Sequence, residues 1–547
     1  MTPEALSAAI RDALAALVAE GRLTVDLPED VKVERPRNRE HGDWATNVAM
    51  QLGKKAGMAP RDLAQLLADH LGQVSGIKSV DVAGPGFLNI TLDPAAAGQL
   101  ARTIVEAGGD YGKSNTLAGH VVNLEFVSAN PTGPLHIGHT RWAALGDSIG
   151  RLLRASGALV TNEHYVNDAG AQMDKFGASI LARAKGEEVP EGGYRGDYVV
   201  ELAHDVMRQR PDLLDLPEDE ALGVARDVGY RLQLAEMKQT LEEFRVQFDV
   251  WFSEKSLHDS GAVVEAVERL RAQGHVYDSE GAVWLRTTDF DDDKDRVLIR
   301  SDGSPTYFAA DAAYYLSKKD RGFPEKIYML GADHHGYVNR LKAIAACAGD
   351  DPDKNIEVLI GQLVTVGGAR LSKRAGNIVE LRDLIAWIGT DAVRYSLARY
   401  PADSPLALNG EDLRRRTNEN PVFYVQYAHA RTAGVSRNSR ELAVRTEDGF
   451  DPSLLDHETE TVLLGQLGEF PRVVAQAAEL REPHRVARYL EQLASAYHKW
   501  YDERRVTPMG DETVTDVHRT RLWLNDATRQ VLENGLHLLG VSAPDRM

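Results

Sequence analysis

One stretch in the first third of the chain restricts the fold more than any other. Residues 120–127 read HVVNLEFV and residues 158–166 read ALVTNEHYV, and both are apolar runs typical of β-strands. Between them the breakers ANPTGP lead into HIGHTRWAALGDSIGRLLRAS at 136–156, a pattern that predicts a helix. A strand–helix–strand unit of this kind starts a doubly wound parallel sheet, so we predict an α/β, Rossmann-like domain.

The rest of the chain divides into parts around this sheet, because 547 residues exceed what one core usually supports. Short helices and strands predict a small α+β domain at 1–105, and the sheet pattern continues to about 400. Within that second domain, which we place at 115–400, an acidic and largely helical stretch at about 175–290 reads as an insertion. Residues 401–547 read as an all-α bundle.

Composition indicates the cellular compartment and the kinds of binding partner to expect. Its single cysteine, Cys347, excludes an internal disulfide and a cysteine zinc cluster, which fits a reducing cytoplasm. The first helix places Leu6, Ile10, Leu14 and Leu17 at amphipathic spacing and lacks the features of a signal peptide. No apolar run approaches the ~20 residues that span a bilayer, so we expect no membrane contact. The net charge of −19 argues against diffuse nucleic-acid binding but not against a local basic surface.

Two histidines stand where the helix begins. His136 and His139 are three residues apart and share one face of the first turn, with Gly138 between them. Free amides and the positive end of a helix dipole favour anions, so we interpret this corner as a site for a polyphosphate. Two alternatives are a helix cap with two solvated histidines and a metal pair, which lacks a convincing third ligand.

A second segment could supply cations to the predicted polyphosphate site. After the strand-like GQLVTV, residues 367–377 read GGARLSKRAGN, with Arg370, Lys373 and Arg374 around Ser372 behind flexible glycines. Such a loop suits a transition state in which pyrophosphate leaves. Taken alone, the segment could equally be a solvated run of charge.

Together, PLHIGH and RLSKR resemble the two signature sequences of the class I aminoacyl-tRNA synthetases. The stretches HYVNDAGAQM, YFAADAAYY, GADHHGYVNR and FYVQYAHAR narrow the resemblance to bacterial arginyl-tRNA synthetases, over essentially the whole chain. The resemblance implies that L-arginine, ATP and tRNA(Arg) give arginyl-tRNA, AMP and pyrophosphate, with Mg²⁺ accompanying ATP. Arg370 and Arg374 depart from the usual second signature, so we expect altered tuning of that loop, with Lys373 in place.

The resemblance also implies how the substrates are held. His136, His139 and Lys373 would stabilise charge on the phosphates, with Gly138 and Ser372 as further ATP contacts. A guanidinium needs carboxylates, and the expected arginine contacts are Glu125, Ser128, Asn130, His139, Tyr307, Asp311 and His334.

Local pattern supports only part of this set. Ser304 and Pro305 fit the cap and first position of a helix on which Tyr307 and Asp311 share a face. The plainer alternative is a surface acid and a packing ring. A metal at the adjacent histidines of GADHHG is disfavoured, because neighbours in a strand point to opposite faces, and we expect no structural metal.

Two regions of the chain are expected to contact tRNA. Residues 411–440 hold six arginines against three acids, and we expect Phe423, Tyr427 and Arg431 to contact the anticodon region, although both rings could be core. The resemblance assigns the N-terminal domain to the D-loop, with Phe87 and Asn89 as contacts, and we expect a monomer. Two rivals remain: a class I synthetase for another amino acid, and a non-catalytic tRNA-binding homologue.

Overall fold

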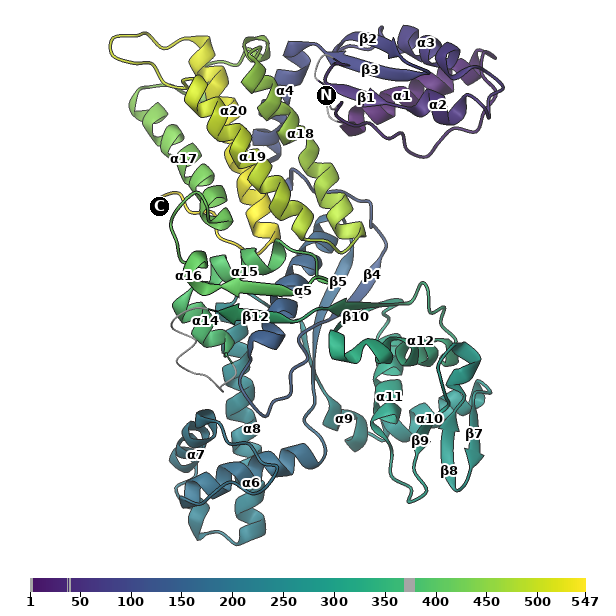
Figure 1. The fold of residues 1–547 in the computed structure, drawn as a ribbon, viewed down its shortest axis with the longest axis vertical. Coiled ribbons are helices and arrows are strands. Elements are labelled where there is room, and N and C mark those ends of the chain that lie inside the picture. Colours follow the sequence, from purple (N-terminus) through teal and green to yellow (C-terminus); the bar gives the residue numbers. More distant parts are fainter. Residues whose placement is uncertain (1–2, 37, 39–40, 368–378) are drawn as a thin grey trace.

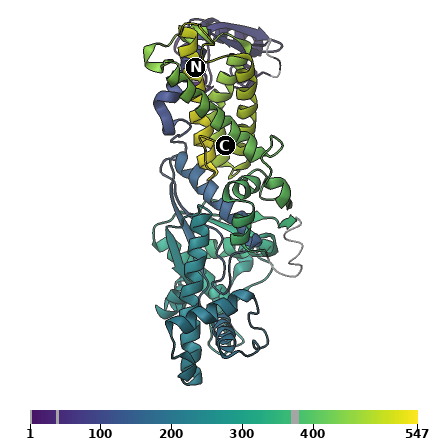
Figure 2. The ribbon, with the colours of Figure 1, turned by 90° about the vertical axis from the view of Figure 1, so that its left-hand side faces the viewer.

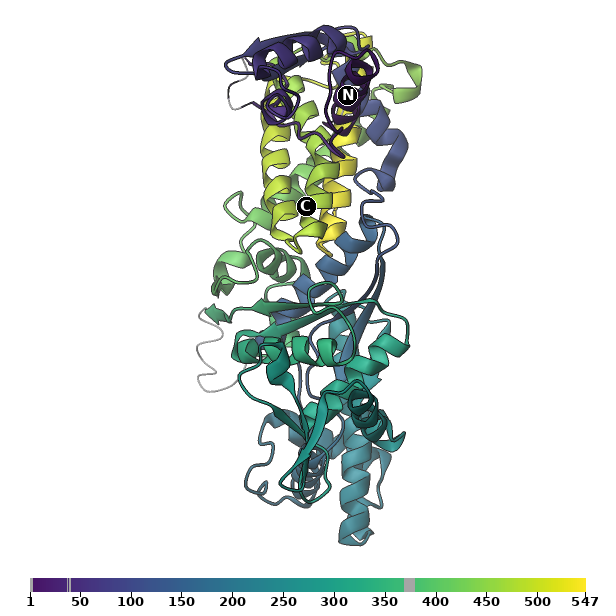
Figure 3. The same ribbon diagram turned by 90° about the vertical axis from the view of Figure 1, so that its right-hand side faces the viewer.

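The computed structural model describes residues 3–36, 38, 41–367 and 379–547, and for His335 it describes the backbone only. The molecule is elongated, with the N-terminal domain beside the outer end of a helical bundle (Figures 1, 2 and 3). The main sheet lies in the middle and the inserted segments lie at the opposite end. Every helix in the described ranges is either too short or too polar to reach across a lipid bilayer.

The N-terminal domain packs helices against a small antiparallel sheet. The three strands lie in the order β1-β3-β2, with β1, β2 and β3 at Trp44–Thr46, Ile77–Ala83 and Phe87–Leu92. The helices are α1 Pro3–Ala19, α2 Val48–Leu52, α3 Pro60–Leu71 and, leading out of the domain, α4 Pro94–Ala107. Leu6, Ile10, Leu14 and Leu17 of α1 are buried, which confirms the predicted amphipathic helix.

The main sheet has five parallel strands, at β4 Val121–Glu125, β5 Leu159–Val166, β6 Val250–Ser253, β10 Glu325–Gly331 and β11 Ile356–Gly361. Their order in space is β11-β10-β4-β5-β6. The chain therefore runs outward from β4 to β6 and then returns to the other side of β4. This confirms the doubly wound sheet, and it places a crevice between the carboxyl ends of β4 and β10.

The helix that follows β4 is α5, at Ile137–Ala155, as predicted. Most of its residues are buried, because it packs between the sheet and the bundle. Gly146 allows this close approach: a Cβ there would lie 2.3 Å from a ring carbon of Phe126. The start of α5 is thereby held at the end of β4.

The insertion is divided by a strand that the sequence pattern does not reveal. Residues 250–253 form β6, the edge strand of the main sheet, although they lie inside the stretch expected as a helical insertion. Before β6 come α6 Ala171–Lys185, α7 Asp197–Gln209 and α8 Glu218–Glu243. After it come α9 Glu254–Asp259, α10 Ala262–Ala272, an antiparallel sheet of β7 Val276–Ser279, β8 Ala282–Leu285 and β9 Arg296–Ile299, and α11 Tyr307–Asp320.

The remaining elements complete the sheet domain and form the bundle. A 3-10 turn, η5 Ala332–Tyr337, and α12 Val338–Cys347 separate β10 from β11, and β12 Val364–Gly367 pairs with β13 Leu406–Asn409. The helices that follow are α14 Leu381–Trp387, α15 Thr390–Ala398, α16 Gly410–Leu413, α17 Pro421–Glu441, α18 Glu458–Glu479, α19 His484–Glu503 and α20 Asp516–Leu538. Further 3-10 turns lie at Gly108–Asp110, Leu213–Asp215, Thr287–Phe290, Thr446–Asp448 and Pro452–Leu454.

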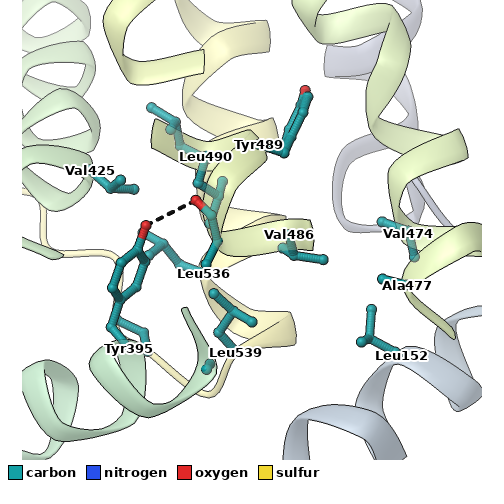
Figure 4. Close-up of a cluster of buried hydrophobic side chains, with 14 of the residues drawn as sticks. Leu152, Tyr395, Val425, Val474, Ala477, Val486, Tyr489, Leu490, Leu536 and Leu539 are labelled. Atoms are coloured by element: carbon teal, nitrogen blue, oxygen red, sulfur yellow. Dashed lines mark hydrogen bonds between the residues drawn. The ribbon is translucent and has the colours of Figure 1, made fainter. Parts of the chain in front are cut away.

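The sheet domain and the bundle share one hydrophobic core. Leu152 of α5 and Tyr395 of α15 point into the same cluster as Val425, Leu490 and Leu536 of the bundle (Figure 4). Burial of apolar surface at about 25 cal/mol per Å² makes such a continuous core the main stabilising contribution at this junction. The bundle is therefore fixed against the helix that carries the two histidines.

Candidate active site

The histidine corner is built from four consecutive residues. His136 is the N-cap of α5, and its Nδ1 accepts a hydrogen bond from the Gly138 amide at 3.1 Å. The His136 amide donates in turn to Nδ1 of His139 at 3.3 Å, and the ring centroids lie 3.9 Å apart. Because both Nδ1 atoms accept, the neutral rings carry their protons on Nε2. A Cβ at Gly138 would lie 2.8 Å from the His136 ring, which explains the glycine.

Electrostatics keep both imidazoles neutral. Burial lowers the pKa of His136. Burial, together with the charge that His136 would carry, lowers the pKa of His139 to about 3. At neutral pH the corner therefore offers two N–H donors without positive charge of its own.

The expectation of free amides at this helix start is wrong. The Ile137 amide donates to the Val379 carbonyl at 2.9 Å, and the Gly138 amide to the ring of its own cap. These amides are occupied because His136 and Glu380 form a β-bridge. Its second hydrogen bond runs from the Leu381 amide to the Leu135 carbonyl, at 2.8 Å. The donors aimed at a ligand are consequently the imidazoles.

This bridge brings Glu380, which follows the second signature segment in the sequence, to the corner. Glu380, which pairs with His136, follows the GGARLSKRAGN segment by only a few residues. Ser372 and Lys373 themselves lie outside the described residues. Their predicted role in binding ATP stays a prediction.

Beside the corner lies a buried acid whose charge is already balanced. Glu125, at the end of β4, accepts from the Ser128 hydroxyl at 3.0 Å and from the Lys318 ammonium at 2.6 Å. Lys318 is fully buried, with its ammonium 4.5 Å from the centroid of the Tyr314 ring and 3.8 Å from that of Tyr328. Glu125 is thus one end of an internal ion pair, a role that the sequence did not indicate.

Two further acids belong to this pocket, and burial favours the protonated form of each. Asp311 on α11 accepts a hydrogen bond from the Tyr337 hydroxyl. Burial, with the charges of Glu254 and Glu125, raises the pKa of Asp311 to about 8. Burial also raises the pKa of Glu254, which lies at the end of β6. A cation placed between Asp311 and Glu254 would relieve both shifts, so the pocket is chemically prepared for a positively charged group.

Glu254 is the acid that sequence reasoning missed. It follows the apolar run VWFS as Glu125 follows VVNL, so an acid at a strand end was the available signal. It lines a cavity of about 770 Å³ together with Tyr307, whose side chain is 70% exposed. His258 contributes a ring nitrogen 3.6 Å from the Glu254 carboxylate. Tyr307 therefore stands free to cover a ligand in this cavity.

The turn after β4 has an unusual backbone. Val127 and Ser128 adopt left-handed φ angles of 68° and 44°, which are costly for residues other than glycine. The turn is held from β5: the Tyr165 amide donates to the Ser128 hydroxyl at 3.1 Å, and the Ala129 amide to Nε2 of His164 at 3.3 Å. This arrangement fixes Ser128 beside Glu125 and leaves Asn130 exposed at the crevice.

The predicted cap of α11 needs correction. The cap of α11 is Thr306, whose hydroxyl accepts from the Ala309 amide at 3.2 Å, and not Ser304. Ser304 instead bonds to Asp302, because Pro305 is still extended in a bridge with Ile299.

In η5, the residue that reaches Asp311 is Tyr337. His334 has a side chain that is 58% exposed and lies 3.4 Å from its neighbour Asp333. Its predicted contact with arginine stays a prediction.

The N-terminal domain has a cavity of its own. It measures about 460 Å³ and is lined by Phe87 and Asn89 of β3, with the basic residues Lys32, Arg35 and His41 on its rim. Phe87 is 40% exposed, whereas Asn89 is buried. An exposed ring next to a buried amide resembles a site for a single unstacked base.

In the bundle, the predicted aromatic residues form a half-buried ladder. The rings of Phe423 and Tyr427 stack at 5.9 Å, and Arg431 lies 5.0 Å from the Tyr427 ring and 4.5 Å from that of Tyr501. Arg431 also bonds to His498 at 3.1 Å, which joins α17 to α19. We call these five residues the aromatic ladder. Their partial exposure, rather than core burial, suits contact with bases.

Comparison with known families covers most of the chain. Residues 4–92 match the arginyl tRNA synthetase N terminal domain, and residues 425–547 match the DALR anticodon binding domain. Residues 102–191 and 223–395 match the catalytic domain of tRNA synthetases class I (R).

Individual relatives agree with these matches. The chain is 66% identical to the arginine–tRNA ligase of Paenarthrobacter aurescens and 65% identical to that of Pseudarthrobacter chlorophenolicus, with all of both chains covered in each case. A putative arginyl-tRNA synthetase structure from Campylobacter jejuni superposes with a TM-score of 0.76 at 33% identity, over 83% of this chain and all of that one. Thermus thermophilus arginyl-tRNA synthetase shares the fold, with a TM-score of 0.76 at 23% identity and full coverage of both chains. The chain belongs to the arginyl-tRNA synthetase family and has its class I catalytic domain.

Proposed function

We propose that this arginine–tRNA ligase works through two neighbouring sites, one for phosphates and one for a guanidinium. The arginine carboxylate attacks the α-phosphate of ATP, an arginyl-adenylate forms and pyrophosphate leaves. The 2′-hydroxyl of the 3′-terminal adenosine of tRNA(Arg) then attacks the carbonyl of the adenylate, and AMP leaves. The observation that carries the proposal is the position of both sites at the carboxyl edge of the main sheet: Glu125 ends β4, the histidine corner opens the helix that follows β4, and Glu254 follows β6.

At the histidine corner, the Nε2–H groups of His136 and His139 would donate hydrogen bonds to phosphate oxygens of ATP. Gly138, between the two histidines, would be a further ATP contact. Lys373 and Ser372 of the second signature would bind the same phosphates. Neutral donors stabilise charge that develops in the transition state without first having to release a counterion. Mg²⁺ would arrive with ATP, because phosphate oxygens are the hard ligands that it prefers.

In the acidic pocket, Asp311 and Glu254 would bind the guanidinium, with Tyr307 covering it. A planar fork of N–H donors suits two carboxylates, and a ring can stack on its face. Glu125 would act through the Ser128 hydroxyl that it fixes, and Ser128 and Asn130 would orient the α-amino and carboxylate end. His139 is close enough in sequence to His136 to contact both substrates, and His334 remains a candidate at the rim.

Two surfaces would bind tRNA(Arg). Phe87 and Asn89 would take a D-loop base in the N-terminal cavity, and Phe423, Tyr427 and Arg431 would contact the anticodon region. We propose a monomer, because one chain supplies both the histidine corner and the acidic pocket. We place the enzyme in the cytoplasm, because translation occurs there.

The experiment that tests the function is arginine-dependent ATP–pyrophosphate exchange, measured with tRNA(Arg) present. Arginine should support exchange and aminoacylation. Exchange with glutamate or cysteine and none with arginine would point to a synthetase for another amino acid. Absence of any arginine-dependent AMP formation would point to a non-catalytic tRNA-binding protein.

A further inference from the structure

Helix α7 of the insertion reaches back to the turn that precedes the histidine corner. The Tyr198 hydroxyl donates a hydrogen bond of 2.7 Å to the carbonyl oxygen of Thr132. Thr132 is buried and lies four residues before His136. A side chain from the far end of the molecule therefore holds the backbone from which the corner starts (Figure 1).

The tyrosine ring fits against two glycines. A Cβ at Gly133 would lie 3.2 Å from the Tyr198 hydroxyl oxygen, and a Cβ at Gly196 would lie 2.6 Å from a ring carbon. Contacts this short would displace the ring or the turn. Burial raises the pKa of Tyr198, so the hydroxyl keeps its proton and remains a donor.

The same helix touches the other side of the corner. Arg382 donates to Glu380 at 2.6 Å and lies 3.8 Å from Glu201 on α7. Glu380 is the residue that bridges His136. Helix α7 thus contacts the chain shortly before His136, at Thr132, and shortly after Glu380, at Arg382.

We propose that Tyr198 is a positioning residue for the histidine corner, so that the placement of the insertion sets the rate of the ATP-dependent step. The inference rests on the proposed role of His136 and His139. Tyr198 acts through the Thr132 carbonyl: without this donor the turn can rotate, and the two Nε2–H groups lose their alignment with the phosphates. A misplacement of about 1 Å far from the reacting atoms is enough to reduce turnover.

The test is Tyr198→Phe, which keeps the ring against Gly133 and removes only the hydroxyl. We expect kcat for arginine-dependent pyrophosphate exchange, with tRNA(Arg) present, to fall about tenfold, the effect of losing one well-formed hydrogen bond. The KM for ATP should rise severalfold. The affinity for arginine should change much less than kcat, because Asp311 and Glu254, which would bind the guanidinium, lie on other elements.

Tyr194→Phe is the matched control. Tyr194 precedes Tyr198 by four residues, and its ring packs edge-on against Phe176 inside the insertion. It should retain the kcat of the unmodified enzyme. Equal losses in Tyr194→Phe and Tyr198→Phe would indicate general damage to the insertion and would overturn the inference.

A second variant covers the case in which Tyr198→Phe does not fold. Gly133→Ala keeps the hydroxyl but pushes the ring away from the turn, and it should lower kcat by a similar factor, with a much smaller change in arginine affinity. His136→Ala separates the two hypotheses. If His136→Ala is impaired and both Tyr198→Phe and Gly133→Ala match the unmodified enzyme, only the positioning role fails. If His136→Ala is fully active, the proposed function of the corner fails.

Discussion

The histidine corner and the acidic pocket lie at the carboxyl edge of the same sheet but are constructed in opposite ways. The corner comes from four consecutive residues, whose side chains and amides bond to one another, and both its rings are neutral. The pocket collects Glu125, Glu254 and Asp311 from β4, the end of β6 and α11, and it concentrates carboxyl groups. One site is local and neutral, and the other is assembled by the fold and acidic.

The difference matches the chemistry proposed for each site. The phosphates of ATP are already charged and gain further charge as pyrophosphate leaves, and preorganised neutral donors can stabilise this additional charge. A guanidinium is charged throughout, so it needs carboxylates that are costly to bury until it arrives. Damage to the corner should therefore lower turnover, whereas damage to the pocket should lower affinity.

The largest expected effect is on arginine affinity in Asp311→Asn. Loss of a buried charge partner should weaken arginine binding roughly 10³-fold, with kcat at saturating arginine reduced far less. The melting temperature should not fall, because Asn keeps an acceptor for Tyr337 and removes an acid that burial disfavours. Calorimetric titration with arginine and a thermal melt check this. Affinity within threefold of the unmodified enzyme would remove Asp311 from the pocket.

Next in size is the loss of turnover in His136→Ala. Removal of one preorganised donor should lower kcat about 10²-fold, with unchanged arginine affinity. His457→Ala is the control, since His457 caps α18 with the same geometry, its Nδ1 3.2 Å from the Thr459 amide. It should lower stability and leave kcat unchanged. If His136→Ala and His457→Ala both lower stability and neither lowers kcat, the histidines of the corner serve only as helix caps.

A smaller effect is expected from pH. Asp311 holds a proton below its raised pKa of about 8, and it must release that proton to pair with a guanidinium. Arginine affinity should therefore rise as pH increases from 6 to 8, by up to about tenfold per pH unit, and level off above 8. Titrations across this range in the unmodified enzyme and in Asp311→Asn test it. A slope that persists in Asp311→Asn would assign the proton to another group.

The smallest effect should come from the aromatic ladder. Phe423→Ala removes one stacking ring from the surface of α17 and should raise the KM for tRNA(Arg) about tenfold. Exchange kinetics for arginine and ATP at saturating tRNA should not change, because the ladder lies in the bundle. Aminoacylation at varied tRNA concentration measures this. An unchanged KM would identify Phe423 as packing.

Features fixed by local pattern were predictable from the sequence. The strand, breakers and amphipathic run around His136 define β4, α5 and β5, and Glu125 stands visibly at a strand end. Strand β6 was not predicted, because its four residues, VWFS, show no alternation of apolar and polar residues and lie inside a helical and acidic stretch. Ser304 was a plausible cap until Pro305 paired with Ile299, a contact that only the folded hairpin creates.

Pairings across long sequence distances could not be predicted. Lys318 reads as an ordinary helix lysine, yet it is buried against Glu125, 193 residues away. Glu254 acquires its role because β6 lies at the edge of the sheet beside β5, where it approaches α11. Tyr198 likewise meets Thr132 only through the arrangement of the insertion. Each is a product of topology, on which a single sequence carries little information.

The most direct measurement is a crystal structure with arginine and a non-hydrolysable ATP analogue bound together. We predict the guanidinium within hydrogen-bond distance of both Asp311 and Glu254, and phosphate oxygens on Nε2 of His136 and His139. A guanidinium bound away from those two carboxylates, or phosphates that avoid both imidazoles, would contradict the division of this edge of the sheet into an acidic and a neutral site.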